Sequence, residues 1–130
     1  MKQISIIIVV LILIFVGSYI SQGYIKTTSN QLVSKINELQ EELQKSIETN
    51  DNKKSVELAG DIMNEWDEIE KKWSIVVLHN ELDNIELALI GMKSHIETEQ
   101  YADGMEELEK SKFLLEHLTQ REKFSLKNIF

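Results

Sequence analysis

Histidines and carboxylates are the side chains of this sequence whose types and spacing could support chemistry. His79 and Asp83 are four positions apart, which places them on one face of a continuous helix and would supply half of a metal site. A histidine held by a carboxylate at a helix junction gives the same spacing and is the simpler interpretation. His79 and Asp83 are therefore the candidate metal ligands, while His95 and His117 lie among charged residues and are expected to be solvated.

An acidic ladder and two tryptophans are the other candidates for ligand binding. Glu57, Asp61, Glu65 and Glu68 recur at helical spacing and could collect Ca²⁺ or a basic partner. A ladder on a helix lacks the loop carbonyls and the tight turn of calcium sites, so we expect a solvated face. Trp66 and Trp73 could stack on a ligand, but their heptad spacing predicts that both are core anchors.

Motifs for catalysis are missing from the sequence. It contains no cysteine, so a thiol nucleophile, a disulfide and a thiolate metal site are all excluded. No Gly-rich phosphate loop or Ser elbow is present, and the three histidines do not form the Glu-x-x-His set of two-metal helix bundles. We therefore predict a protein that is not an enzyme and needs no cofactor.

Apolar residues at spacings of three and four predict four helices after residue 31. The fourth is expected over about residues 102–123, with Ser111 and Lys112 interrupting its apolar stripe. The pattern predicts an all-α fold in which two αα-hairpins form an antiparallel four-helix bundle over residues 32–130. In chain order, the predicted inward sets are Leu32, Val33, Ile36, Leu39, Leu43 and Ile47; Ala59, Ile62, Trp66, Ile69, Trp73 and Val76; Leu82, Ile85, Leu89, Met92 and Ile96; and Met105, Leu108, Leu115 and Leu118.

The junctions between these helices carry turn and capping residues. The run of residues 50–52, Asn-Asp-Asn, predicts the first turn. After Val76 the apolar phase slips, and either Asn80 caps a new helix or a kinked helix continues. Gly60 and Gly91 lie inside predicted helices, which suggests close approach of neighbouring helices there.

A shift of forty-nine residues aligns the two predicted hairpins without a gap. Ile36, Trp66 and Ile69 then fall on Ile85, Leu115 and Leu118. A duplicated hairpin explains this match. Any two heptad-patterned hairpins of equal length would also match at their core positions, so both explanations stay open.

The stretch that decides where the protein resides is residues 4–20, seventeen residues without a charge, of which thirteen are Ile, Leu, Val or Phe. These thirteen contribute about −4 to −8 kcal/mol to membrane insertion. We predict a transmembrane anchor over residues 1–23 and a juxtamembrane linker over residues 24–31. A signal peptide cut after Gly23 is the alternative, and it would leave a secreted helical domain.

The charges favour one topology and exclude one ligand class. Setting Lys2 aside leaves thirteen Lys and Arg against twenty-two Asp and Glu, so nucleic acid would be repelled. Lys2 on one side of the span nearly balances Lys26 and Lys35 on the other. Because an N-terminal apolar segment normally directs export, we expect a single-pass protein of the cell membrane with a cytoplasmic N-terminus and the acidic domain outside.

Three short segments stand out: Trp66-Asp67-Glu68 followed by Trp73, His79-Asn80-Glu81-Leu82-Asp83, and Leu126-Lys127-Asn128-Ile129-Phe130. With the single N-terminal span, they resemble an uncharacterised bacterial family of short single-span helical proteins, classed as a domain of unknown function. Members of that family look like frequent gene neighbours of a multi-span membrane protein in spore-forming bacteria. The resemblance implies an accessory or partner role and carries over no catalytic residue.

We therefore expect a non-enzymatic interaction module whose partners are the lipid bilayer and either a multi-span membrane protein or a second copy of itself. The C-terminal residues Phe124, Leu126, Ile129 and Phe130 are the candidate contact, unless that tail folds back and closes the bundle. The alternative is a small-ligand sensor, because such bundles also form receptor domains. Those receptors add a second span and an output domain, and residues 24–130 contain neither.

Overall fold

A computed structural model describes the backbone of residues 1–129 and the side chains of residues 1–121. Four helices account for almost all of the described chain: α1 (Lys2–Thr49), α2 (Lys53–Trp73), α3 (His79–Glu97) and α4 (Tyr101–Ile129). The described residues contain no strand, so the all-α class is confirmed.

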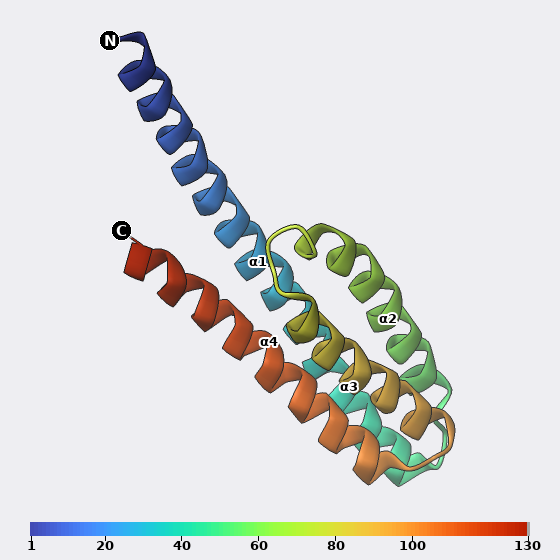
Figure 1. Cartoon of the computed structure of the whole chain (residues 1–130). Coiled ribbons are helices and arrows are strands. Elements are labelled where there is room, and N and C mark those ends of the chain that lie inside the picture. The colour runs from blue at the N-terminus through green and yellow to red at the C-terminus, as the bar shows by residue number, and fades with distance from the viewer. Residues whose placement is uncertain (130) are drawn as a thin grey trace.

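The helices lie side by side, with a long free end on α1 (Figure 1). α1 contacts α2 and α4, and α3 contacts the same two helices, so each helix has two neighbours. Each short connection turns the chain back on itself, and the first part of α1 extends beyond the other helices (Figure 1). This places the α2–α3 connection at the end of the molecule from which α1 projects.

The core follows the predicted apolar pattern closely. Trp66 and Trp73 are fully buried, with their ring centroids 5.8 Å apart in an edge-to-face arrangement. All five predicted residues of α3 are buried, and so are Leu108, Leu115 and Leu118 of α4. Both tryptophans are therefore core residues and are not available to a ligand.

The predicted linker is wrong, because α1 runs from Lys2 to Thr49 without a break. Residues 24–31 are helical, and Ile25, Thr28 and Ser29 are buried against the other helices. The Thr and Ser side chains of this segment, which predict a helix cap, form hydrogen bonds elsewhere. Thr28 Oγ1 donates to Tyr24 O of the same helix at 2.8 Å, and Ser29 Oγ donates to Leu115 O of α4 at 3.4 Å. One helix thus connects the apolar N-terminal segment directly to the core.

The first turn lies where it is predicted, but the last inward position of α1 differs. Asn50 adopts a left-handed conformation (φ 57°) that ends α1, and Lys53 N donates to Asp51 Oδ1. Ile47 is 51 % exposed, and Ser46 occupies the buried position in its place. The hydroxyls of Ser46 and Ser55 lie 2.7 Å apart, so one donates a hydrogen bond to the other inside the core.

Neither prediction for the α2–α3 junction is correct. α2 ends at Trp73, and α3 starts at His79 after the five-residue loop 74–78, so no kinked helix continues. Leu78, in an extended conformation, stands at the N-cap of α3 in place of Asn80, without a side-chain capping bond. Val76 is exposed and Val77 is buried, because the turn after Trp73 changes the phase by one residue.

In α4 the inward stripe continues through Ser111, which is fully buried and donates a hydrogen bond to Glu107 O at 2.8 Å. This internal bond lets a hydroxyl take a core position without a partner from another helix. Met105, predicted to point inward, is only half-buried. Gly60 has no atom within 4 Å of where a Cβ would stand, so the close approach expected there is absent among the described atoms.

The forty-nine-residue shift holds for the second helix of each half. Each buried position among the described side chains of α4 falls on a buried position of α2: Gly104, Leu108, Ser111, Leu115 and Leu118 match Ser55, Ala59, Ile62, Trp66 and Ile69. The non-glycine residues with positive φ, Asn50 and Glu99, are also separated by this shift. The first helices agree less well, since Ile47 is exposed and Ile96 is buried.

Candidate functional site

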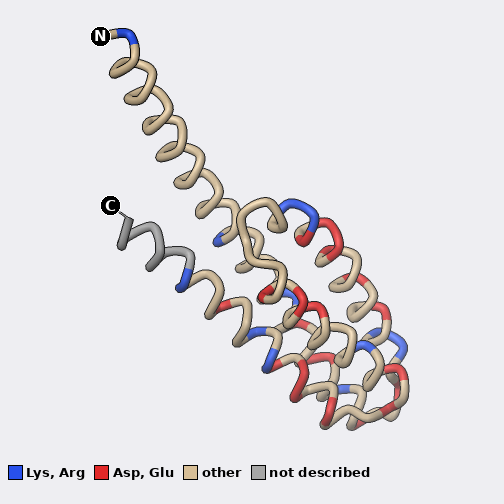
Figure 2. Tube along the Cα trace, in the orientation of Figure 1, with Lys and Arg blue, Asp and Glu red and all other residues tan. Residues whose placement is uncertain are grey.

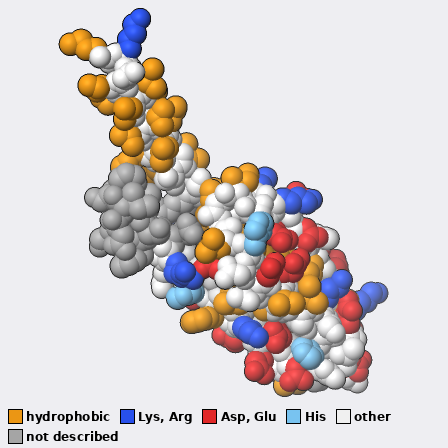
Figure 3. Space-filling model, in the orientation of Figure 1, with side chains coloured by type: hydrophobic (Ala, Val, Ile, Leu, Met, Phe, Trp, Pro, Cys, Tyr) orange, Lys and Arg blue, Asp and Glu red, His pale blue; other side chains and the backbone are white. Residues whose placement is uncertain are grey.

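The apolar N-terminal part of α1 is the largest exposed apolar surface of the described chain. Its large apolar side chains from Ile4 to Ile20 are all exposed, and Figure 3 shows those on one face of the helix. By length and composition this helix can cross a membrane, and none of its most apolar eighteen-residue window is buried. A signal sequence near the N-terminus meets the same two criteria.

Where α1 enters the helix cluster, it contacts the end of α2. Trp73 Nε1 donates to Thr28 Oγ1 at 3.0 Å, and Lys72 Nζ lies 5.7 Å from the centroid of the Tyr24 ring. The cation and the ring attract each other at this distance. Tyr24, Thr28 and the last turn of α2 therefore lie at one level along α1, and we call this level the α1-entry level.

The loop of residues 74–78 lies at the α1-entry level and is largely apolar (Figure 1). Ile75 is 84 % exposed, Leu78 is 64 % exposed and Val76 is 46 % exposed, while Val77 is only 5 % exposed. Backbone hydrogen bonds hold the loop, since the amides of Val76 and Val77 both donate to Trp73 O, at 2.9 and 2.8 Å. Val77 thus fixes a turn that presents three apolar side chains to the outside.

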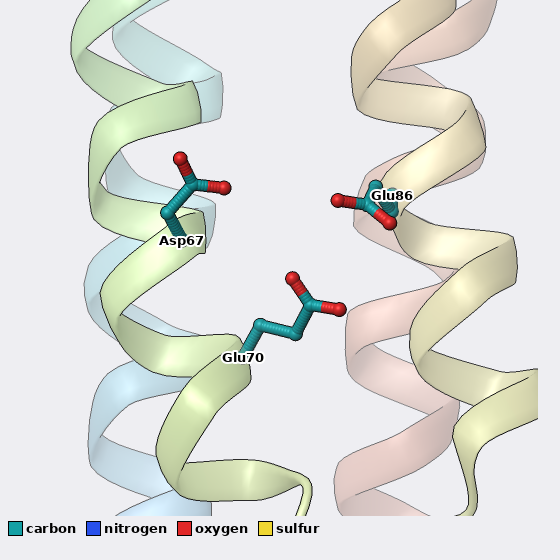
Figure 4. A group of neighbouring side chains, drawn as sticks. All are labelled: Asp67, Glu70 and Glu86. Carbon is teal, nitrogen blue, oxygen red and sulfur yellow. The ribbon is translucent and has the colours of Figure 1, made fainter.

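A cluster of three carboxylates lies between α2 and α3. Asp67, Glu70 and Glu86 offer oxygens that all lie within 4.8 Å of one another (Figure 4). Asp67 is exposed, and the two glutamates are half-buried. Among the described side chains, no other group of three His, Cys, Asp or Glu residues meets this criterion.

This arrangement places like charges together. Partial burial, and then the nearby charges of Glu86, Asp67 and Asp83, raise the pKa of Glu70, while His79 opposes the change. Oxygen atoms so close could bind a hard cation or share a proton. Exposed carboxylates often meet in this way without a ligand, so the cluster by itself defines no metal centre.

The candidate metal ligands from the sequence do not form the core of a site. His79 and Asp83 share the first turns of α3 and are both exposed, and neither belongs to the three-carboxylate group. The sequence does not predict this cluster, because Glu86 belongs to α3 and the other two carboxylates belong to α2. The register of α3 against α2 is set by packing. The sequence signal was the i, i+3 pair Asp67 and Glu70, which flanks the buried Ile69.

The acidic ladder of α2 is divided between different neighbours. Glu65 Oε2 lies 2.5 Å from Lys35 Nζ of α1, and this contact with Glu65 raises the pKa of Lys35. Glu68 pairs with Lys71 at 3.6 Å on the exposed surface. Two of the four ladder carboxylates therefore have a lysine partner, and none of the four belongs to the three-carboxylate group.

The predicted C-terminal contact lies outside the described side chains. This applies to Phe124, Leu126, Ile129 and Phe130, and to the neighbouring Lys123 and Lys127. Arg121, at the limit of the described side chains, pairs with Glu81 and joins α4 to α3.

Comparison with known proteins gives a match to a protein family. No curated protein and no solved structure matches the chain. The sequence model of one family matches residues 19–129, which covers α2, α3, α4 and most of α1. The matched region includes the tryptophans, the apolar loop and the three carboxylates. The chain therefore belongs to the family described as a domain of unknown function (DUF4363).

Proposed function

We propose that this protein is a non-enzymatic interaction module, an antiparallel four-helix bundle of two hairpins that a single transmembrane helix holds at the membrane surface. The N-terminus is cytoplasmic and the acidic bundle lies outside. The bundle is an accessory subunit whose partner is a multi-span membrane protein or a second copy of the chain.

The continuity of α1 carries this proposal. Its N-terminal part exposes apolar side chains on all sides, which is favourable in lipid and costly in water. Only a few residues later the same helix buries Ile25 and Leu32 in the bundle core. A single helix therefore runs from the apolar segment into the core without an intervening loop.

A partner surface on the bundle is available on α3 and α4. Leu87 and Ile90 of α3 and Phe113 of α4 are exposed large apolar residues. The ring of Phe113 stacks on His117, with 5.7 Å between the centroids. Because α1 has no flexible linker, any protein that contacts these residues must reach them close to the bilayer.

Alkaline extraction of membranes and intact-mass measurement test the anchor. The protein is expected to stay in the membrane pellet with a mass of 15.1 kDa. In a matched variant with Val10→Lys and Leu13→Lys, the two mid-span charges raise the free energy of membrane insertion by about 5 to 7 kcal/mol. This variant is expected in the soluble fraction. A soluble wild-type protein that starts at Tyr24 would contradict the anchor.

Crosslinking in intact membranes tests the partner. A photoreactive residue at Leu87 or Phe113 is expected to give one discrete adduct with a multi-span protein or with a second copy. The matched control carries the photoreactive residue at Ile47, which is exposed at the opposite end of α1. Absence of a discrete adduct from both test positions would refute an interaction through these helices.

A further inference from the structure

We propose that the loop of residues 74–78 is a second membrane contact, which inserts Ile75, Val76 and Leu78 into the headgroup boundary of the bilayer that α1 crosses. The inference rests on the proposed function and extends it. Its ligand is the lipid surface itself, with a preference for anionic headgroups.

The position of the loop along α1 is the first argument. Twenty-two helical steps separate Lys2 from Tyr24, a length of about 33 Å, and a bilayer hydrocarbon core is about 30 Å thick. When Lys2 lies in one headgroup layer, Tyr24 therefore lies at the opposite boundary. The contacts of Tyr24 with Lys72 and of Thr28 with Trp73 place the end of α2, and the loop after it, at that same level.

The shape of the loop is the second argument. Val77 is buried, and the amide bonds to Trp73 O fix the turn, so the outward direction of its neighbours is built in. Three large apolar side chains on a five-residue loop have no apolar partner among the described residues that would bury them. Because the loop lies beside the span, the bilayer boundary is the apolar phase within reach.

Charge is the third argument. Lys71 and Lys72 form the last basic pair of α2, directly before the loop, and Lys26 follows Tyr24 in α1. Figure 2 shows basic residues at this end of α2, and acidic residues together with further basic ones along the rest of the helices. The net charge of the chain is −8, so these lysines are a local exception. Cations beside an inserting apolar loop attract anionic phospholipid headgroups.

Single-cysteine labelling of the full chain tests the contact, since the wild-type sequence contains no cysteine. Ile75→Cys and Leu78→Cys variants are labelled with a polarity-sensitive fluorophore and reconstituted in phosphatidylcholine–phosphatidylglycerol vesicles. The loop labels are expected to shift to the blue, to be quenched by spin-labelled lipid and to be shielded several-fold from iodide. An Ile47→Cys label at the far end is expected to be fully open to iodide, and a Leu11→Cys label marks the span.

The outcomes separate the two proposals. If iodide reaches the loop labels as easily as the Ile47→Cys label while the Leu11→Cys label is in lipid, the loop contact is overturned and the anchor stays intact. A Leu11→Cys label open to iodide would overturn the anchor and the loop contact together. Lys71→Gln with Lys72→Gln is expected to reduce the shielding of the loop labels, and unchanged shielding would overturn the role of these lysines. Circular dichroism of each variant verifies the fold.

Discussion

The two tryptophans of α2 are equally buried but differ in their hydrogen bonds. Trp73 Nε1 donates to Thr28 Oγ1, whereas Trp66 Nε1 is buried without a hydrogen-bond partner among the described groups. A buried N–H that lacks a partner costs about 1 to 3 kcal/mol. Trp66 therefore stabilises the core by its apolar surface alone, and Trp73 also ties α2 to α1.

This difference predicts unequal effects of the same substitution. Trp73→Phe is expected to lower the free energy of unfolding by about 2 to 4 kcal/mol more than Trp66→Phe, because the change at Trp73 removes a hydrogen bond and the change at Trp66 removes a buried N–H that has no partner. Replacement of either by Ala is expected to cost about 3 to 5 kcal/mol. Urea denaturation of the full chain in detergent, followed by circular dichroism, measures both effects. Equal losses for the two Phe variants would contradict the assigned role of Thr28.

Glu70 gives a prediction with a defined pH dependence. Its pKa is raised in the folded protein, so above that pKa the ionised carboxylate destabilises the fold. Glu70→Gln is expected to raise the denaturation midpoint at neutral pH. The gain is expected to shrink as the pH falls through the raised pKa, because the wild-type folded state then binds a proton.

Glu68→Gln is the matched control for this variant. Glu68 is exposed on the same helix and pairs with Lys71 in solvent, so its loss is expected to change the midpoint little. If the advantage of Glu70→Gln stayed constant down to acidic pH, the three-carboxylate cluster would not be the cause.

At the scale of residues, the spacing of apolar residues predicts which side chains are buried. It does not predict which polar side chains form hydrogen bonds with one another. The heptad phase identifies Trp66, Trp73 and Leu89 as core because periodicity decides which face is inward. The contacts of Thr28 with Trp73 and of Ser46 with Ser55 depend on how far one helix is shifted along another. That register is a property of the packed helices, so no single segment reveals it.

The element that differs most from the sequence prediction is α1. Residues 27–30, Thr-Thr-Ser-Asn, are poor helix formers, and intrinsic propensity alone favours a break there. Burial of Ile25 and Leu32 on either side, with hydroxyls bonded inside the core, outweighs that local preference. Tertiary packing therefore decides the conformation of this segment.

Hydrogen exchange tests the continuity of α1. Amides of residues 26–31 are expected to exchange slowly, at rates close to those of residues 36–43 in the same helix, because both belong to one hydrogen-bonded ladder. Mass spectrometry of the protein in detergent measures the rates. Fast exchange confined to residues 26–31 would restore the linker that the sequence suggests.

Two glycines separate helix propensity from packing. Gly60→Ala is expected to stabilise α2 by about 1 kcal/mol, because alanine favours the helix and the site is open. Gly104→Ala is the matched test of contact, since its Cβ would lie 3.1 Å from Ile96 Cγ1 in the core. We expect Gly104→Ala to lower the melting temperature and Gly60→Ala to raise it. The reverse order would contradict the α3–α4 packing.

For the molecule as a whole, the proposed membrane anchor and an unbroken α1 together predict a fixed height of the bundle above the membrane. A helical insert of seven residues between Gln22 and Gly23 lengthens α1 by about 10 Å over nearly two turns, so it lifts the bundle without rotating it far. The loop label at Ile75→Cys is then expected to become open to iodide. A flexible connection would let the loop stay in the bilayer, so persistent shielding would contradict a stiff α1.

The same continuity turns α1 into a lever. About 38 Å of helix separates Tyr24 from Thr49, so a change of 10° in the tilt of the span would displace the distal turn by about 7 Å. Membrane helices change tilt when bilayer thickness changes. Without a hinge to absorb the angle, thinning or thickening of the lipid around the span would be converted into sideways movement of the tip of the bundle.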